Sequence, residues 1–269
     1  MSLSQIKLGI IGAGSMGGAI ASGLVEAQAA EASSILVAGH GAEKLAALAE
    51  RGIRTFADDG EMLDENPDVV ILAVKPQVLP AVMEQYAAKL AGRVVVSIAA
   101  GVPIAKIEAA LPGARVVRVM PNLCVQVLSG ASAVAGGTTA TSDDVELARQ
   151  IFAALGAAAV MREDQLEVEG AVVGTAPAFF AIFIDTLTRA GVKAGMPAAA
   201  CRDLLEATMR GTATQLLESG EHPRAYAEKV TSPGGTTAAG LYELEPALFD
   251  GSFAAVDAAL ARAAELAGK

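Results

Sequence analysis

The chain has little of what several protein classes depend on. Its 269 residues include no tryptophan, two cysteines and two histidines. Two cysteines are too few for a disulfide framework, so Cys124 and Cys201 are expected to be free thiols in a reducing compartment, which indicates a cytoplasmic protein. Because no cluster of His, Cys and Asp shows ligand spacing, no metal site is expected.

Basic charge and long apolar runs are scarce as well. The formal net charge is -10, so the surface repels phosphate backbones and anionic lipid, and neither nucleic acid nor a membrane is expected as a partner. One uncharged apolar stretch, residues 171–184, has 14 residues, whereas a membrane span needs about 20. We interpret it as a buried helix. Small molecules and further copies of the chain remain as partners.

Two patterns of apolar residues divide the chain near Met161. Up to that residue, short β-branched runs alternate with alanine-rich stretches, which predicts a doubly wound α/β domain over residues 1–161. Beyond it the β-branched runs stop, and an all-helical domain is predicted over residues 162–269. The predicted strands are 7–11, 34–38, 68–74, 93–98, 115–119 and 132–135, with weaker ones near Ile53 and Ala158. The predicted later helices are 178–194, 197–218 and 236–267, with a break near Pro246.

A glycine-rich loop follows the first predicted strand. Gly12, Gly14 and Gly17 form G-x-G-x-x-G at the start of a helical run. In this position the first glycine permits a tight turn, the second lets the backbone approach a pyrophosphate, and the third lets helix and strand pack closely. The alternative is a plain strand-to-helix turn. The context favours a dinucleotide cofactor in a Rossmann-like domain, with Ser15 and Met16 at the helix N-terminus beside the phosphates.

The end of the second predicted strand bears on the choice of cofactor. Domains that prefer NAD usually carry Asp or Glu there, whereas this chain has Ala38, Gly39 and His40. Because His40 and Lys44 are able to face a 2'-phosphate, NADPH is favoured and NADH is possible. The alternative is that His40 is a solvated loop residue.

Two later loops fall at the carboxyl ends of predicted strands, where open α/β sheets bind ligands. Ala73, Lys75 and Pro76 lie in one of them, and Ala99 and Gly101 lie in the other. Both loops are predicted to touch the cofactor, although Lys75 is equally well an ordinary residue at the start of a helix.

A second loop of small residues reads Ser-Pro-Gly-Gly-Thr-Thr from Ser232 to Thr237 and leads into an apolar-periodic helix. This loop suits a small carboxylate. Gly234 and Gly235 offer backbone N–H groups, the helix dipole adds positive character, and the hydroxyls of Ser232, Thr236 and Thr237 complete the site. The alternative is an N-capped helix after a Pro-Gly turn, for which one hydroxyl suffices.

With this loop, the chain resembles the pyrroline-5-carboxylate reductase family over nearly its whole length. The matching segments, in order, are the Gly12 loop, Ala-Val-Lys-Pro at 73–76, Val-Met-Pro-Asn at 119–122, Ala-Pro-Ala-Phe at 176–179, and 230–240. The resemblance implies reduction of 1-pyrroline-5-carboxylate to L-proline by hydride from NAD(P)H, in proline biosynthesis. It also implies dimerisation through the helical domain, as a homodimer or a dimer-based higher oligomer, and adds Asn122 to the cofactor-binding residues.

The chain departs from the family's pattern at several positions. Met-Pro-Asn-Thr-Pro is usual, but Leu123 and Cys124 stand in the last two places here, and Ser-Gly-Ser-Gly-Pro-Ala appears with Val173, Thr175 and Ala176. The family's usual arginine after the second strand is absent. At Leu123 and Val173 apolar groups thus replace hydroxyls, which leaves open a larger cyclic imine as substrate, a weaker enzyme, or neutral drift.

The expected chemistry depends on positioning, since hydride must reach the C=N carbon while the ring nitrogen is hydrogen-bonded. Thr237 is the predicted catalytic residue at that nitrogen, and Ser232, Gly235 and Thr236 are predicted to hold the carboxylate of the small imino acid, with Gly234 beside them. A 2-hydroxy-acid dehydrogenase would need a histidine base. It is disfavoured because His40 lies in the cofactor half and His222 lies beside Pro223 in a predicted turn, so neither suits that role.

Two other functions share parts of this sequence pattern. A hydroxyisobutyrate-type dehydrogenase uses a Lys-x-x-x-Asn pair on a long helix, but both asparagines here, Asn66 and Asn122, lie in the first half. A catalytically silent dinucleotide-binding regulator remains possible. NADPH oxidation with and without pyrroline-5-carboxylate distinguishes it from the enzyme.

Overall fold

The computed structural model describes residue 3 and residues 6–266. The chain divides into two compact units. The first takes in the described residues up to Thr175 together with the last helix from Leu260, and the second is Ala176–Ala259. Each unit is described by itself.

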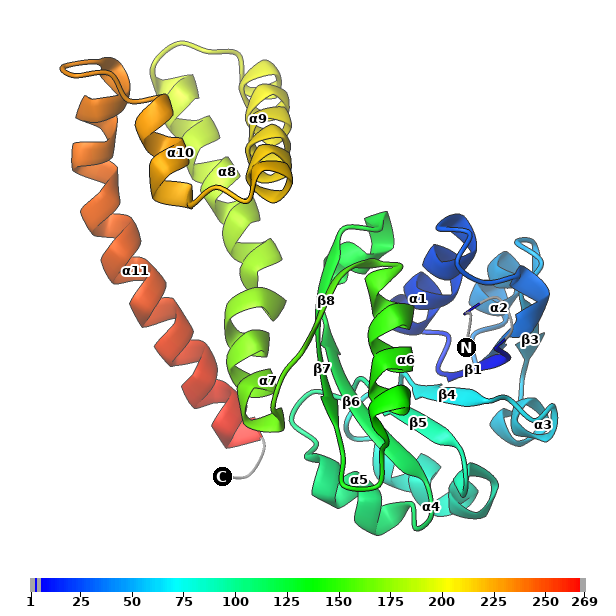
Figure 1. The fold of residues 1–269 in the computed structure, drawn as a ribbon. Coiled ribbons are helices and arrows are strands. Elements are labelled where there is room, and N and C mark those ends of the chain that lie inside the picture. Colours follow the sequence, from blue (N-terminus) through cyan, green and yellow to red (C-terminus); the bar gives the residue numbers. More distant parts are fainter. Residues whose placement is uncertain (1–2, 4–5, 267–269) are drawn as a thin grey trace. The chain divides into compact units, whose positions relative to one another are not determined.

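The first unit is an eight-stranded sheet of order β3-β2-β1-β4-β5-β6-β7-β8, in which β1 to β6 are parallel and β7 is antiparallel to β6 (Figure 1). The doubly wound prediction is confirmed, and each predicted strand is present. The central strands are apolar throughout because both faces of the sheet are covered. The strands are β1 Leu8–Ile11, β2 Ile35–Ala38, β3 Arg54–Phe56, β4 Val69–Leu72, β5 Val94–Ser97, β6 Arg115–Pro121, β7 Gly130–Gly136 and β8 Gly156–Val160.

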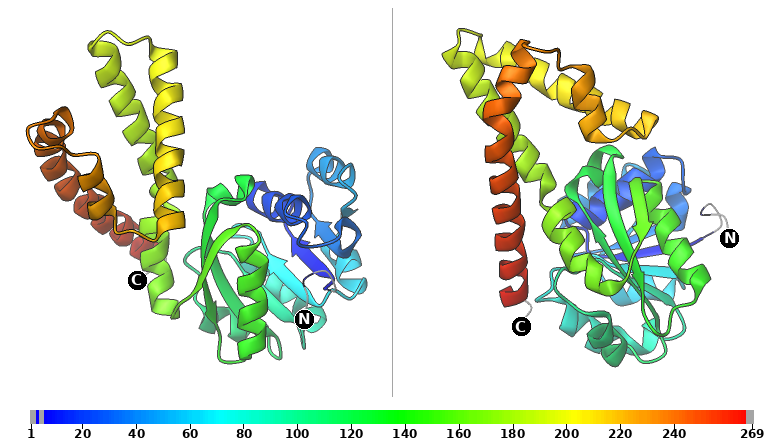
Figure 2. Two further views of the ribbon diagram at one scale, coloured as in Figure 1. Left: turned by 45° about the horizontal axis from the view of Figure 1, so that its top comes forward. Right: turned by 60° about the vertical axis from the view of Figure 1, so that its left-hand side comes forward.

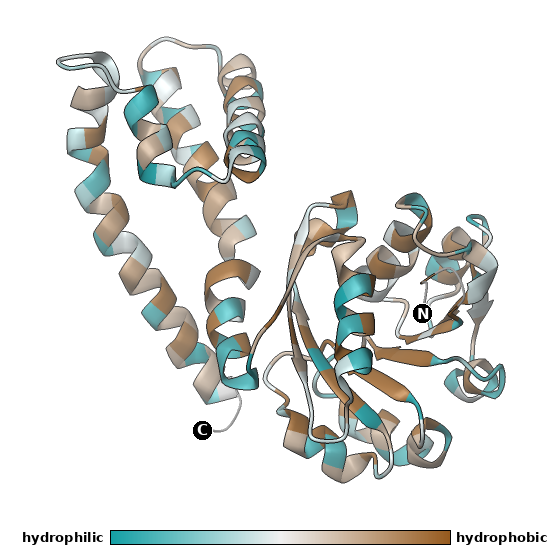
Figure 3. Ribbon diagram, in the orientation of Figure 1, coloured by the Kyte–Doolittle hydropathy of each residue, from teal (hydrophilic) through white to brown (hydrophobic). Residues whose placement is uncertain are grey.

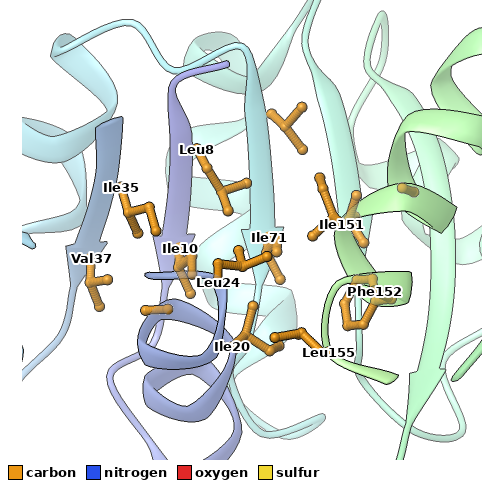
Figure 4. Close-up of a cluster of buried hydrophobic side chains, with 14 of the residues drawn as sticks. Leu8, Ile10, Ile20, Leu24, Ile35, Val37, Ile71, Ile151, Phe152 and Leu155 are labelled. Atoms are coloured by element: carbon orange, nitrogen blue, oxygen red, sulfur yellow. The ribbon is translucent and has the colours of Figure 1, made fainter. Parts of the chain in front are cut away.

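Helices cover both faces of this sheet. They are α1 Ser15–Glu26, α2 Ala42–Ala49, α3 Asp59–Asp64, α4 Leu79–Leu90, α5 Ile104–Ala110, α6 Ser142–Ala153 and α7 Glu163–Glu169, with short turns η2 Ala32–Ser34, η3 Leu123–Val127 and the π-helical η4 Gly170–Gly174. Helices α1, α2 and α6 bury one apolar cluster, in which Ile20, Leu24 and Phe152 meet the strands (Figure 4). Helices α3, α4, α5 and α7 bury the other.

The second unit is helical. It contains α8 Ala176–Lys193, α9 Ala198–Ser219, α10 Pro223–Lys229 and most of α11 Thr236–Leu266. Figure 2 shows α8 and α9 as neighbouring antiparallel helices joined by a short loop. The all-helical prediction is confirmed, and the predicted helices agree with α8, α9 and α11 to within two residues at each described end.

Two local expectations were wrong. The predicted break near Pro246 is absent, because α11 continues through it. Proline removes the hydrogen bond to the carbonyl four residues earlier, that of Tyr242, but Tyr242 is exposed, so water is able to satisfy this carbonyl. The turn expected at His222 is the start of α10, where His222 Nδ1 accepts from the Arg224 N–H at 3.1 Å and Pro223 takes the first helical position.

The prediction that residues 171–184 form a buried helix is correct for the helix and wrong for its burial within one chain. No described residue of α8 is buried, and Phe180 and Ile182 are 57% and 65% exposed. Figure 3 shows apolar residues along this helix. By length and composition alone, the continuous helical segment Glu163–Lys193 is sufficient to cross a membrane. The composition predicts that the apolar face of this helix is buried, but it does not show whether this chain or another molecule buries it.

Candidate functional site

The turn between β1 and α1 requires two of its three glycines for the fold itself. Gly12 has φ +115°, and a Cβ there would lie 2.5 Å from the carbonyl oxygen of Ala73. Gly12 also donates its N–H to the Ala38 carbonyl at 2.8 Å. A Cβ on Gly17 would clash with the carbonyl oxygen of Gly12. Gly12 and Gly17 therefore allow the strand, the turn and the helix to pack closely.

Gly14 differs from these two glycines. Its φ of -74° suits any residue, and a Cβ there would meet no atom within 4 Å. It is exposed and caps α1 without a side-chain hydrogen bond, so no capping side chain occupies the N-terminus of α1. Such a helix end attracts anions. The residues present fit a dinucleotide pyrophosphate. The chain's own packing does not require a glycine at position 14, whereas close approach of a ligand to the backbone would require one.

A cavity of about 470 Å³ opens from this helix end, at the carboxyl ends of β1 and β2. Gly12, Gly14 and His40 line it, as predicted for cofactor contacts, and so does Lys44. Ser15 lines a neighbouring groove between α1 and α2, while the half-buried Met16 packs against the apolar cluster under α1.

Two carboxylates in this cavity were missed by the sequence interpretation. Glu43 comes from α2, and Asp59 comes from α3. Burial raises the pKa of the Asp59 carboxyl, and the nearby His40 partly offsets the rise. Asp59 follows β3, which lies two strands from β1 in the sheet, and the sequence contains no signal for that strand order.

The other predicted cofactor residues lie at the same edge of the sheet without lining that cavity. Ala73 follows β4 and donates its N–H to the Ile11 carbonyl at 2.8 Å. Lys75 is exposed, and its carbonyl accepts from the N–H groups at the start of α4, which is the ordinary role noted for it. Pro76 follows it. Ala99 and Gly101 follow β5.

Asn122 follows β6 and is buried, with its side-chain oxygen and nitrogen both hydrogen-bonded. Its Oδ1 accepts from the N–H groups of Cys124 and Ala131, each at 3.2 Å, and its Nδ2 donates to the Val173 carbonyl at 3.4 Å. These bonds hold the start of β7, η3 and η4 together. Asn122 thus shapes this edge of the sheet through its own contacts.

The departures from the usual motif lie close to this residue. Leu123 is 53% exposed. Thr175 keeps a hydroxyl, but its Oγ1 donates to the Ala171 carbonyl at 2.7 Å, so that hydroxyl is used within the helix backbone.

The second predicted site is brought together in the helical unit. Gly234 has φ +71°, and the Gly235 N–H donates to the Ser232 carbonyl at 3.0 Å, which forms a tight turn directly before α11. Thr236 begins the helix and is exposed, and Thr237 is half-buried. Within the residues the structure describes, no hydrogen bond engages the hydroxyls of Ser232, Thr236 and Thr237. The loop thus presents free donors at the positive end of a long helix.

A buried carboxyl on α7 had no signal in the sequence. Glu169 is 7% exposed, and its Oε2 has no hydrogen-bond partner. Burial raises its pKa from 4.5 to about 7. It lies immediately before the π-helical turn η4, next to the departures at Val173 and Thr175.

This carboxyl predicts a pH-dependent stability. Because the folded-state pKa lies above the unfolded value, folded protein binds the proton more tightly, and the contribution is complete below pH 4.5 and lost as pH rises through 7. The loss is at most about 3 kcal/mol. We expect Glu169→Gln to remove this dependence, so urea midpoints at pH 5 and pH 8 should differ less in the variant than in the wild type.

Glu206→Gln, at an exposed position of α9, is the control and should keep the wild-type pH dependence. Equal pH dependence in Glu169→Gln and the wild type would contradict the assignment.

Comparison with family models gives matches to both units. Residues 163–266 match the model described as pyrroline-5-carboxylate reductase dimerisation, and residues 7–101 match NADP oxidoreductase coenzyme F420-dependent.

Relatives match over the full length. The chain is 38% identical to a pyrroline-5-carboxylate reductase of Methanosarcina acetivorans, covering 98% of both chains. It is 36% identical to one of Synechocystis, covering 98% of this chain and 100% of that protein.

Solved structures agree. A pyrroline-5-carboxylate reductase of Coxiella burnetii has a TM-score of 0.92 at 32% identity, covering 97% of this chain and 98% of the other. A pyrroline carboxylate reductase of Plasmodium falciparum, with NADP bound, has a TM-score of 0.86 at 27% identity, covering 99% of each chain.

Proposed function

The chain belongs to the pyrroline-5-carboxylate reductase family, and from this premise we propose how its own residues carry out the reaction. The enzyme reduces 1-pyrroline-5-carboxylate to L-proline with NAD(P)H, in proline biosynthesis. The bound cofactor supplies the hydride for the C=N carbon. The protein binds both molecules, orients them and stabilises the ring nitrogen.

In the first unit, the proposed cofactor site is built around Gly14. Its open environment is the observation that carries the proposal, because this glycine serves no packing need of the chain. Gly12, Ser15 and Gly17 complete the turn that holds the pyrophosphate at the N-terminus of α1. The remaining proposed contacts at the carboxyl edge of the sheet are Met16, His40, Ala73, Lys75, Pro76, Ala99, Gly101 and Asn122.

In the second unit, the proposed substrate site is the loop before α11. Ser232, Gly235 and Thr236, with Gly234 shaping the turn, hold the carboxylate through N–H groups and hydroxyls. Thr237 hydrogen-bonds the ring nitrogen as hydride arrives at the neighbouring carbon. The free hydroxyls and the helix dipole support this assignment.

The test of ring size is NADPH oxidation by the purified enzyme with five- and six-membered cyclic imino acids. We expect the five-membered pyrroline-5-carboxylate to have the higher kcat/KM. A higher kcat/KM for the six-membered ring would contradict this expectation and would favour a larger cyclic imine as the substrate, in keeping with the apolar residues Leu123 and Val173.

Cofactor choice is predicted from the cavity at α1. His40 and Lys44 border it, so we expect a lower KM for NADPH than for NADH. Lys44→Gln should raise KM for NADPH and leave KM for NADH unchanged, because only NADPH carries the 2'-phosphate. A lower KM for NADH in the wild type would overturn this prediction, and the carboxylates Glu43 and Asp59 would then account for it.

The dimerisation match shows that assembly is dimer-based. We propose a homodimer, or a higher assembly of such dimers, joined through the helical domain that we place at residues 162–269, after a cofactor domain at 1–161. The exposed Phe180 and Ile182 of α8 support this, since apolar residues at such density need a cover. Light scattering at micromolar concentration tests it, and a monomer would contradict it. We also propose a cytoplasmic location, in keeping with the free thiols of Cys124 and Cys201.

A further inference from the structure

A buried arginine lies in the middle of β6. Arg118 is 2% exposed, and its two terminal nitrogens reach two carboxylates of α7. Nη2 donates to Glu167 Oε1 at 2.6 Å, and Nη1 lies 3.4 Å from Glu163 Oε1. A buried guanidinium is tolerated only when it is paired, so these contacts hold α7 against the sheet.

Glu163 has a second contact that Glu167 lacks. Its Oε1 accepts from the backbone N–H of Ile104 at 2.6 Å, across 59 residues of sequence. Ile104 is the first residue of α5, and the residue before it, Pro103, offers no side-chain cap. The carboxylate therefore satisfies an N–H group that would otherwise lack a partner at the start of the helix.

The loop that this contact fixes belongs to the proposed cofactor site. Residues 99–103 connect β5 to α5 and contain Ala99 and Gly101, the latter at φ +72°. The loop starts beside β4, since the Ile98 N–H donates to the Leu72 carbonyl at 3.3 Å. The loop therefore lies at the carboxyl edge of the sheet. In the sheet, β4 alone separates β5, which leads into this loop, from β1, which leads into the glycine loop.

The segment from Glu163 to Val173 also contacts residues at the carboxyl end of β6. A Cβ on Gly170 would be in contact with Met120, and the Val173 carbonyl accepts from Asn122. The chain then enters α8 at Ala176. β6 therefore contacts both the segment whose Glu163 fixes the cofactor loop and the turn η4 that precedes α8.

We propose that Glu163 is a positioning residue for hydride transfer. Its carboxylate joins Arg118 to the start of α5 and so holds the loop 99–103 in the conformation that receives the cofactor. The inference rests on the proposed cofactor site and adds a residue outside it that sets its geometry.

The experiment compares Glu163→Ala with Glu167→Ala. Both variants remove one carboxylate from Arg118, but only Glu163→Ala releases the Ile104 N–H. We expect both to lower Tm, and only Glu163→Ala to weaken NADPH binding measured by calorimetry without substrate, by about tenfold. Its kcat should fall by a similar factor, while KM for pyrroline-5-carboxylate stays within about twofold.

Glu163→Gln is the conservative variant, because its amide oxygen still accepts from the Ile104 N–H. It should bind NADPH nearly as the wild type does, although its pairing with Arg118 is weakened. If Glu167→Ala fails to fold, Glu167→Gln takes its place. Equal losses of NADPH affinity in the Glu163 and Glu167 variants, or unchanged affinity in Glu163→Ala, would overturn the inference. A wild-type enzyme that binds no NADPH would instead refute the proposed function.

Discussion

Gly14→Val should abolish NADPH binding while leaving the fold intact. The backbone of Gly14 is compatible with valine, and a Cβ there would find nothing to clash with within 4 Å. It would occupy the space before the N-terminus of α1, where the pyrophosphate is proposed to bind. We expect affinity to fall by about 100-fold or more, measured by calorimetry, since the phosphate contacts and the close approach are lost together.

The control is Gly18→Val, one turn later on α1, where a Cβ would also meet nothing within 4 Å. It changes the same helix outside the pyrophosphate space and should bind NADPH nearly as the wild type does. Thermal unfolding of both variants should be close to that of the wild type. Unchanged affinity in Gly14→Val would remove the glycine loop from cofactor binding, and loss of folding in Gly14→Val would show that this glycine is structural.

Thr237→Ala should reduce catalysis and spare the cofactor. The Thr237 hydroxyl is proposed to hydrogen-bond the ring nitrogen, where charge changes as hydride arrives. Loss of one such bond costs about 1.5 to 3 kcal/mol, or roughly tenfold to a hundredfold in kcat/KM. NADPH binding should be unchanged, because none of the proposed cofactor contacts involves Thr237.

Thr231→Ala is the matched control for this loop. The Thr231 Oγ1 donates to the Ala227 carbonyl at 2.7 Å, so its hydroxyl is used within the protein. This variant should lose stability with little change in kcat/KM. If Thr237 serves only as a helix cap, Thr237→Ala should behave in the same way, losing about 1 kcal/mol of stability and keeping its activity. A stable, fully active Thr237→Ala would exclude the residue from the mechanism.

The sequence alone determined most of the strands and longer helices and their order along the chain, because these depend on local patterns. Apolar runs long enough to be buried on both faces predicted β1, β2 and β4 to β7, with weaker signals for β3 and β8, and apolar periodicity predicted α8, α9 and α11. The spacing of Gly12, Gly14 and Gly17 predicted the turn, since close approach of backbone atoms leaves no room for a Cβ at Gly12 or Gly17. The clustered hydroxyls before α11 were visible for the same reason, as neighbours along the chain.

Tertiary structure decided what depends on residues far apart in sequence. Arg118 pairs with Glu163 and Glu167 across 45 and 49 residues, and no local pattern distinguishes it from a surface arginine. Asp59 reaches the cofactor cavity only because β3 lies beside β2, and the raised pKa of Glu169 follows from burial. Burial and pairing depend on how the whole chain packs. A local sequence pattern indicates which residues are expected to be buried or paired, but not which distant residues they contact.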